Sequence, residues 1–165
     1  MRIAETILIL LITKMCFGQN KIVGIYNNRF SESIELKADS TFIHNYRFDL
    51  ASSWTTGKWK ISNDTIYLKT EIVSDSLQIY NSEGEFIRDS LVLSADKKVD
   101  RIQLSEFIIS TLSSGGQNRI KVPKRIFWKR NKLYRINENG TLDLRKLKAF
   151  WSDKKYKTYF RKESE

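Results

Sequence analysis

The chain has 165 residues, 41% of them apolar, and a formal net charge of +10 at pH 7. This length fits one domain with a single buried core, and the 12% aromatic content favours strands over helices. Because the sequence holds one His and one Cys, it lacks the ligand set of a zinc or copper site and the cysteines of a disulfide framework.

The first 18 residues resemble a secretory signal peptide. Arg2 precedes the apolar run 7–12, and the small residue Gly18 stands before an expected cleavage site at Gln19. The run is too short to span a bilayer. The alternative is a buried first strand or a short helix.

Cleavage at Gln19 would leave a mature chain, 19–165, without Cys or Met, because Met1, Met15 and Cys16 all precede it. A chain without disulfides must be held by its core alone. Together with export, this suggests the periplasm or the outside of a Gram-negative bacterium. We expect no transmembrane segment in the mature chain.

Alternating apolar and polar residues predict a series of strands in the first half of the mature chain. In 41–50 the even positions, from Phe42 to Leu50, are apolar or aromatic except for His44, so this face is expected to point inward. Asn63 and Asp64 fit a two-residue hairpin turn, and Gly57 indicates a bulge or a close approach of the backbone. The expected strands are 22–30, 34–38, 41–50, 54–62 and 65–72.

The second half continues the β pattern with one break. Residues 104–112 repeat apolar side chains at helical spacing, so a short helix and a strand fit this segment equally well. Glu138-Asn139-Gly140 is the strongest hairpin signal. The segment 141–151 fits either a strand or the start of a helix. The further expected strands are 76–81, 85–95, 126–130, 133–137 and a closing strand at 156–162.

About 45 residues carry a resemblance to a known family. The order Gly-x-aromatic, Leu-x-x-Asp-x-Thr-Phe, Gly-x-Trp and Asn-Asp-Thr-Ile-x-Leu is similar to that of bacterial exported lipocalin-like domains, most of which have no assigned activity. It falls on Gly24 and Tyr26, Leu36 to Phe42, Gly57 and Trp59, and Asn63 to Leu68. The chain departs from the pattern at Tyr26, where Trp is usual, at Ser40, where a turn glycine is usual, and in its basic end.

The resemblance implies an antiparallel up-and-down barrel and a cavity for a hydrophobic ligand. We therefore expect a single all-β domain over 19–165. Its architecture would be a lipocalin-like barrel or a strongly curled sheet, with a short helix near 104–112 as one option.

The excess of positive charge lies at one end of the chain. Residues 1–118 carry 13 Lys and Arg against 14 Asp and Glu, whereas residues 119–165, the basic C-terminal part, carry 16 against 5. A partner attracted by charge is expected at that end.

Two sets of candidate site residues follow. A pocket for a small apolar ligand would be lined by inward-facing aromatic residues and the single histidine, although the same residues could simply fill a core: Tyr26, Phe42, His44, Tyr46 and Trp59. A basic face, interleaved with aromatics, would bind an anionic glycan, a lipid head group or another polyanion, although it could equally be a solvated outer face. Its candidate residues are Lys129, Arg130, Arg135, Arg145, Lys146 and Lys148.

No motif in the sequence supplies a catalytic constellation. His44 has no second His, Cys or carboxylate at a recognisable spacing, and the Ser113-Ser114-Gly115-Gly116 run is neither a nucleophile elbow nor a phosphate loop. The expectation is a non-catalytic binding or cell-envelope protein without a cofactor or metal. Export favours a lipid or glycan partner over nucleic acid.

Overall fold

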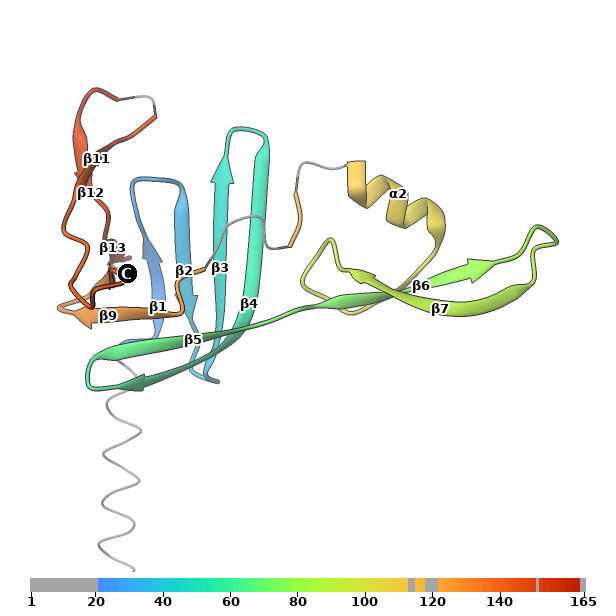
Figure 1. Ribbon diagram of the computed structural model, residues 1–165, viewed down its shortest axis with the longest axis horizontal. Helices are drawn as coiled ribbons and strands as arrows, with labels where there is room; N and C mark the ends of the chain where they lie inside the picture. Colours follow the sequence, from blue (N-terminus) through green and yellow to red (C-terminus); the bar gives the residue numbers. More distant parts are fainter. Residues whose placement is uncertain (1–20, 113–114, 118–121, 151, 164–165) are drawn as a thin grey trace, which may run out of the picture.

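A closed antiparallel barrel forms the body of the molecule (Figure 1). The computed structural model describes residues 21–112, 115–117, 122–150 and 152–163. Within these, eight strands close the barrel in the order β1-β13-β10-β9-β5-β4-β3-β2. They are β1 (Gly24–Asn27), β2 (Glu32–Leu36), β3 (Thr41–Phe48), β4 (Ala51–Ser62), β5 (Thr65–Glu71), β9 (Arg125–Lys129), β10 (Lys132–Arg135) and β13 (Phe160–Lys162). The expected all-β barrel is confirmed.

The barrel follows an up-and-down order with two excursions. The strands β2 to β5 pair with their sequence neighbours, and β13 closes the barrel by pairing with β1 and β10. One excursion lies between β5 and β9, and the other lies between β10 and β13. Both leave and re-enter the barrel without disturbing its neighbour-to-neighbour pairing.

Turn residues accept the backbone conformations that the barrel needs. Asn63 and Asp64 join β4 to β5 with φ of 48° and 59°, as a two-residue hairpin turn requires. Ser40, which stands where lipocalin-like domains usually have glycine, has φ of 65°. Asp39 supports this turn, because its Oδ1 accepts from the Thr41 amide at 2.9 Å and from the Thr41 hydroxyl at 2.6 Å.

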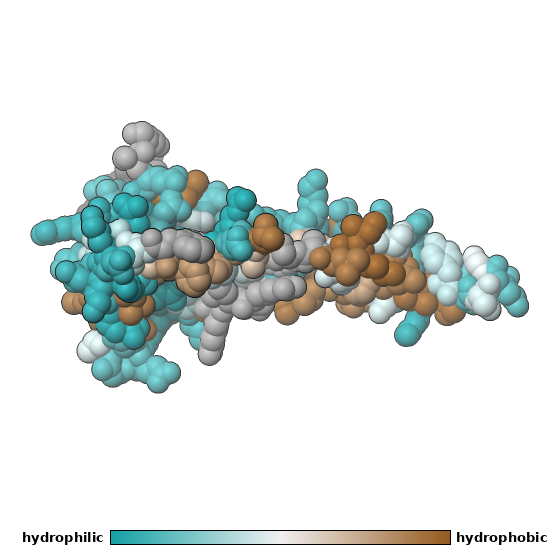
Figure 2. All heavy atoms as spheres, turned by 90° about the horizontal axis from the view of Figure 1, so that it is seen from above, coloured by the Kyte–Doolittle hydropathy of each residue, from teal (hydrophilic) through white to brown (hydrophobic). Residues whose placement is uncertain are grey.

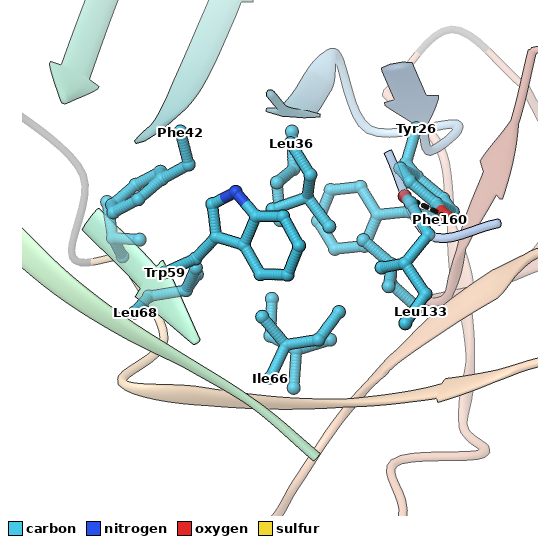
Figure 3. Close-up of a cluster of buried hydrophobic side chains, with 12 residues drawn as sticks. Tyr26, Leu36, Phe42, Trp59, Ile66, Leu68, Leu133 and Phe160 are labelled. Carbon is cyan, nitrogen blue, oxygen red and sulfur yellow. Dashed lines mark hydrogen bonds between the residues drawn. The ribbon is translucent and has the colours of Figure 1, made fainter. Parts of the chain in front are cut away.

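The barrel interior is filled by apolar and aromatic side chains that converge from most of its strands (Figure 3). Tyr26, Phe42 and Phe160 are fully enclosed, and the Tyr26 hydroxyl donates to the Ile22 carbonyl at 2.7 Å. Trp59 also satisfies its ring nitrogen, which donates to the Lys37 carbonyl at 3.0 Å. The other members of this cluster are Ile22, Ile34, Leu36, Ile66, Leu68, Val122, Ile126 and Leu133.

The first excursion forms an arm that extends from the barrel (Figure 1). It contains the sheet β7-β6-β8 and a helix: β6 (Ser74–Tyr80), β7 (Phe86–Leu93), β8 (Arg101–Ile102) and α2 (Leu104–Leu112). The helix is therefore the correct alternative for 104–112. At its start the Glu106 carboxylate accepts from the Gln103 amide at 2.9 Å, which caps the helix.

The arm carries much of the exposed apolar surface (Figure 2). Leu91 of β7 and Leu112 of α2 are about four-fifths exposed, and Ile109 is 70% exposed. Burial alternates along the first half of β6, but the face of β7 that carries Leu91 and Leu93 is exposed. Among the described residues, β6 pairs with β7 and β8, and none of the three joins the barrel sheet.

The second excursion contains the hairpin β11 (Lys146–Lys148) and β12 (Lys155–Lys157). The expected closing strand 156–162 is thus divided, and only β13 closes the barrel. The turn predicted at Glu138-Asn139-Gly140 forms, with Gly140 at φ of 84°, but it is followed by a single bridge between Ile136 and Leu142 rather than a full hairpin.

Within the described ranges, no helix has the length and apolar character needed to cross a bilayer. The predicted signal peptide, 1–18, lies outside the described residues.

Candidate functional site

The hairpin of β11 and β12 gathers lysines on one face. Lys146 lies opposite Lys157, and Lys148 lies opposite Lys155. Directly opposed residues share a face, and like charges so placed repel each other. Lys148 forms an ion pair with Asp153, with 2.6 Å between Nζ and Oδ1. The hairpin therefore concentrates positive charge, at some cost in stability that a bound anion would relieve.

Residues of this hairpin, of the barrel strands β1 and β13 and of the segments beside these strands line a groove of about 790 Å³. We call it the basic groove. Among the described residues, its lining includes six cationic side chains, Arg29, Lys146, Lys155, Lys157, Arg161 and Lys162, and one carboxylate, Glu163. The remaining lining residues are Asn27, Asn28, Tyr156 and Tyr159.

Contacts within the groove orient several of these groups. The Arg161 guanidinium donates to the Tyr159 hydroxyl at 2.8 Å, and Lys132 lies 4.9 Å from the centre of the Tyr159 ring. The hydrogen bond from Arg161, helped by the charges of Arg161 and Lys132, lowers the pKa of Tyr159. The Glu163 carboxylate accepts from the Asn27 amide group at 2.6 Å. The groove is thus a preformed, positively charged surface.

A second hollow, of about 550 Å³, lies beside the basic groove, and we call it the aromatic pocket. Phe48 and Phe150 meet edge to face in its wall, with ring centres 4.7 Å apart. Its lining consists of Arg29, Phe30, Ser31, Glu32, Tyr46, Phe48, Asp49, Lys148, Ala149, Phe150, Ser152 and Tyr156.

Arg29 and Tyr156 belong to both hollows. The guanidinium carbon of Arg29 lies 5.7 Å from the centre of the Tyr156 ring, within the range of a cation–π contact. The two residues therefore form a wall that the two hollows share.

A compact charged network lies next to the aromatic pocket. The Glu32 carboxylate contacts His44 Nε2 at 3.2 Å and forms an ion pair with Arg135, whose guanidinium lies over the ring of Phe160. Burial disfavours ionisation of Glu32, but the hydrogen bond with His44 and the charge of Arg135 outweigh it and lower the pKa of Glu32. Glu32 is thereby held as an ion beside an aromatic surface.

The residues predicted for an apolar pocket are divided between two places. Tyr26, Phe42 and Trp59 pack in the core cluster (Figure 3), and His44 is buried against Glu32. Tyr46 lines the aromatic pocket.

The residues predicted for a polyanion-binding face are also separated. Lys146 lines the basic groove, and Lys148 lines the aromatic pocket. Arg135 is paired with Glu32, and Arg145 is paired with the buried Asp143 at 2.9 Å. Lys129 and Arg130 are exposed at the turn between β9 and β10.

Sequence reasoning missed Arg29 as a groove residue. It belongs to the nearly neutral N-terminal half, so no charge pattern draws attention to it. The pairing of β1 with β13 brings its neighbourhood to the basic end. Lys155, Lys157, Arg161 and Lys162 stood in the basic C-terminal part, but only the structure distinguishes them from their neighbours.

No group of three or more His, Cys, Asp and Glu side chains that could hold a metal ion is found within the described part of the chain. No family model matches the chain, and neither a curated protein nor a solved structure matches it. The fold and the site therefore define the class: an eight-stranded antiparallel barrel, consistent with the lipocalin-like architecture, with a basic groove beside it.

Proposed function

We propose that the protein is a non-catalytic binding protein whose basic groove holds an anionic ligand with several negative groups. The observation that carries this proposal is the excess of six cationic side chains over one carboxylate in the groove lining. Such a concentration of like charge in a hollow attracts polyvalent anions and raises their local concentration.

The construction of the groove supports a role beyond solubility. Its cations come from four separate places, the turn after β1 and the strands β11, β12 and β13, which the fold brings together. Two aromatic side chains, Tyr156 and Tyr159, stand among them. Mixed cationic and aromatic walls suit sugar rings and head groups that carry phosphate, sulfate or carboxylate.

Export to the periplasm or exterior of a Gram-negative bacterium is part of the proposal. The leader-like pattern of 1–18 supports it, and it makes an anionic envelope glycan or lipid head group the expected ligand class. Intact-mass measurement on protein recovered from the periplasm of a Gram-negative host tests this point. The mass should correspond to a chain that begins at Gln19, whereas a chain that retains Met1 would contradict it.

Binding to heparin, used as a sulfated model glycan, tests the groove. Binding should weaken between about 50 mM and about 200 mM salt, because counterions are released from the charges that pair. The double variant K155E/K157E should weaken binding at least tenfold and reduce the salt slope by about two. The fold should survive, since each new carboxylate faces Lys146 or Lys148.

The matched control is K69E/K98E, which makes the same change in net charge. Lys69 lies in β5, and Lys98 lies in the loop after β7; both are exposed and neither lines the groove. The control should bind heparin within about twofold of the unmodified protein at low salt. Equal losses in both double variants would mean that net charge alone attracts heparin, and would overturn the proposal.

A further inference from the structure

We propose that the basic groove and the aromatic pocket are one composite site for an anionic amphiphile, a molecule with a charged head and an apolar tail. The placement of the charged head rests on the proposed function of the groove. The placement of the apolar tail rests on the pocket alone.

Adjacency is the first argument. Arg29 and Tyr156 line both hollows, so a ligand that lies across this shared wall contacts both. Their volumes, about 790 Å³ and about 550 Å³, each lie in the range of ligand sites in proteins. A head in one hollow and a tail in the other would fit side by side.

The chemistry of the pocket wall is the second argument. Five aromatic side chains line it in the described part of the chain: Phe30, Tyr46, Phe48, Phe150 and Tyr156. Phe150 is 71% exposed although it packs against Phe48, so a large apolar area stays in contact with water. Covering that area with an alkyl tail removes it from water.

The charges fix the direction of the ligand. The aromatic pocket carries two carboxylates, Glu32 and Asp49, against two cations, Arg29 and Lys148, whereas the basic groove carries six cations against one carboxylate among its described lining residues. A negative head is therefore attracted more strongly to the groove than to the pocket, whose charges balance. An alkyl tail has the opposite preference, because it gains nothing from the lysines and gains burial against the aromatic rings.

Arg29 and Tyr156 stand where head and tail would join. Arg29 is exposed at the groove and presents hydrogen-bond donors that match a phosphate or a carboxylate. The Tyr156 ring lies beneath the guanidinium and continues into the pocket. The pair therefore presents one polar and one apolar surface at adjacent positions.

Calorimetric titration with butyl, octyl and dodecyl phosphate, each below its micelle concentration, tests the composite site. A fully buried methylene strengthens binding by about fourfold. Because the pocket is open, we expect an overall gain of about tenfold from butyl to octyl. The variant Phe150→Ser should abolish this gain while leaving butyl phosphate binding within about twofold. Because Phe150 is exposed, the variant should keep the fold.

Two further variants separate the halves of the inference. Leu91→Ser, which removes an equally exposed apolar side chain from the arm, should leave all three affinities unchanged. K155E/K157E should weaken all three phosphates together. If affinity does not depend on tail length, or if Phe150→Ser has no effect on that dependence, the composite site is overturned while the basic groove stands. If none of the phosphates binds, the composite site is overturned, and the heparin measurement decides the basic groove separately.

Vesicles distinguish the source of the amphiphile. The protein is sedimented with vesicles of phosphatidylglycerol or of phosphatidylcholine. If it sediments only with phosphatidylglycerol, and Phe150→Ser abolishes this, the tail belongs to a lipid in a bilayer. Binding of dodecyl phosphate without sedimentation would assign it to a free amphiphile. Absence of both would overturn the composite site.

Discussion

The guanidinium carbon of Arg29 lies 5.7 Å from the centre of the Tyr156 ring, at the boundary between the basic groove and the aromatic pocket. The two residues are far apart in sequence, and their contact depends on the closure of the barrel, since β1 ends just before Arg29 and pairs with β13, a few residues after Tyr156. The candidate site is thus a consequence of barrel closure.

Arg29 offers a direct test of this boundary. Arg29→Ala should weaken octyl phosphate binding about tenfold, which equals about 1.4 kcal/mol. The affinity of Arg29→Lys should fall between those of Arg29→Ala and the unmodified protein. Lysine keeps the charge but lacks the planar group that stacks on the ring and forms two parallel hydrogen bonds. Calorimetric titration measures both. The exposed Arg88→Ala, in the arm, serves as the control, and equal losses in Arg88→Ala and Arg29→Ala would contradict a specific role for Arg29.

Glu32 should make stability depend on acid pH. Its pKa in the folded protein is lower than the ordinary value of 4.5, so the unfolded chain takes up the proton first as the pH falls. The stabilisation that the ionised Glu32 gives the folded protein is therefore complete above the ordinary pKa of a glutamate. It is lost as the pH falls through the lower pKa that Glu32 has in the folded protein. Glu32→Gln should lower the free energy of unfolding by roughly 2–4 kcal/mol near neutral pH, because Arg135 loses its partner.

Urea denaturation from about pH 7 to about pH 3 measures this effect, and the difference between Glu32→Gln and the unmodified protein should shrink over that window. The exposed Glu83→Gln, at the tip of the arm, should show no such convergence. A difference for Glu32→Gln that is constant across the window would mean that the charge of Glu32 does not stabilise the barrel.

Gly57 should not tolerate a side chain. A Cβ at this position would overlap the Lys69 carbonyl oxygen and lie 2.8 Å from both Phe42 Cε1 and Thr70 Cα. Because two of these atoms belong to the paired strand backbone, the barrel wall would have to shift. We expect Gly57→Ala to cost about 3 kcal/mol in urea denaturation, whereas Lys58→Ala, at the exposed next position, should cost less than about 0.5 kcal/mol. Similar costs for the two variants would show that the wall yields easily.

Much of the barrel could be predicted because its information is local. The alternation around Phe42 and the turn at Asn63 and Asp64 gave β3, β4 and β5 close to their observed bounds. The same alternation predicted β6 and β7 as strands. It could not reveal that they form a separate arm, since a period of two indicates which side chains share a face and not which strand lies alongside.

The site was harder to predict because its residues meet only through distant pairings. The register of Tyr26 with Lys162 and of Lys146 with Lys157 decides which cations share the groove. Net charge identified the basic C-terminal part. It could not show that Lys157 lines the groove whereas Arg145 forms an ion pair with Asp143. Arg29 carried no signal in the sequence.

Amide chemical-shift mapping with inorganic pyrophosphate tests the central claim most directly. Pyrophosphate is small, so its largest effects should mark the residues that hold the anion. We predict saturable shifts at 27–29, at 155–157 and at Arg161 to Glu163, with little change in the arm. Shifts that centre instead on Lys129 and Arg130 or on the arm, or no saturable shifts at all, would contradict binding in the basic groove.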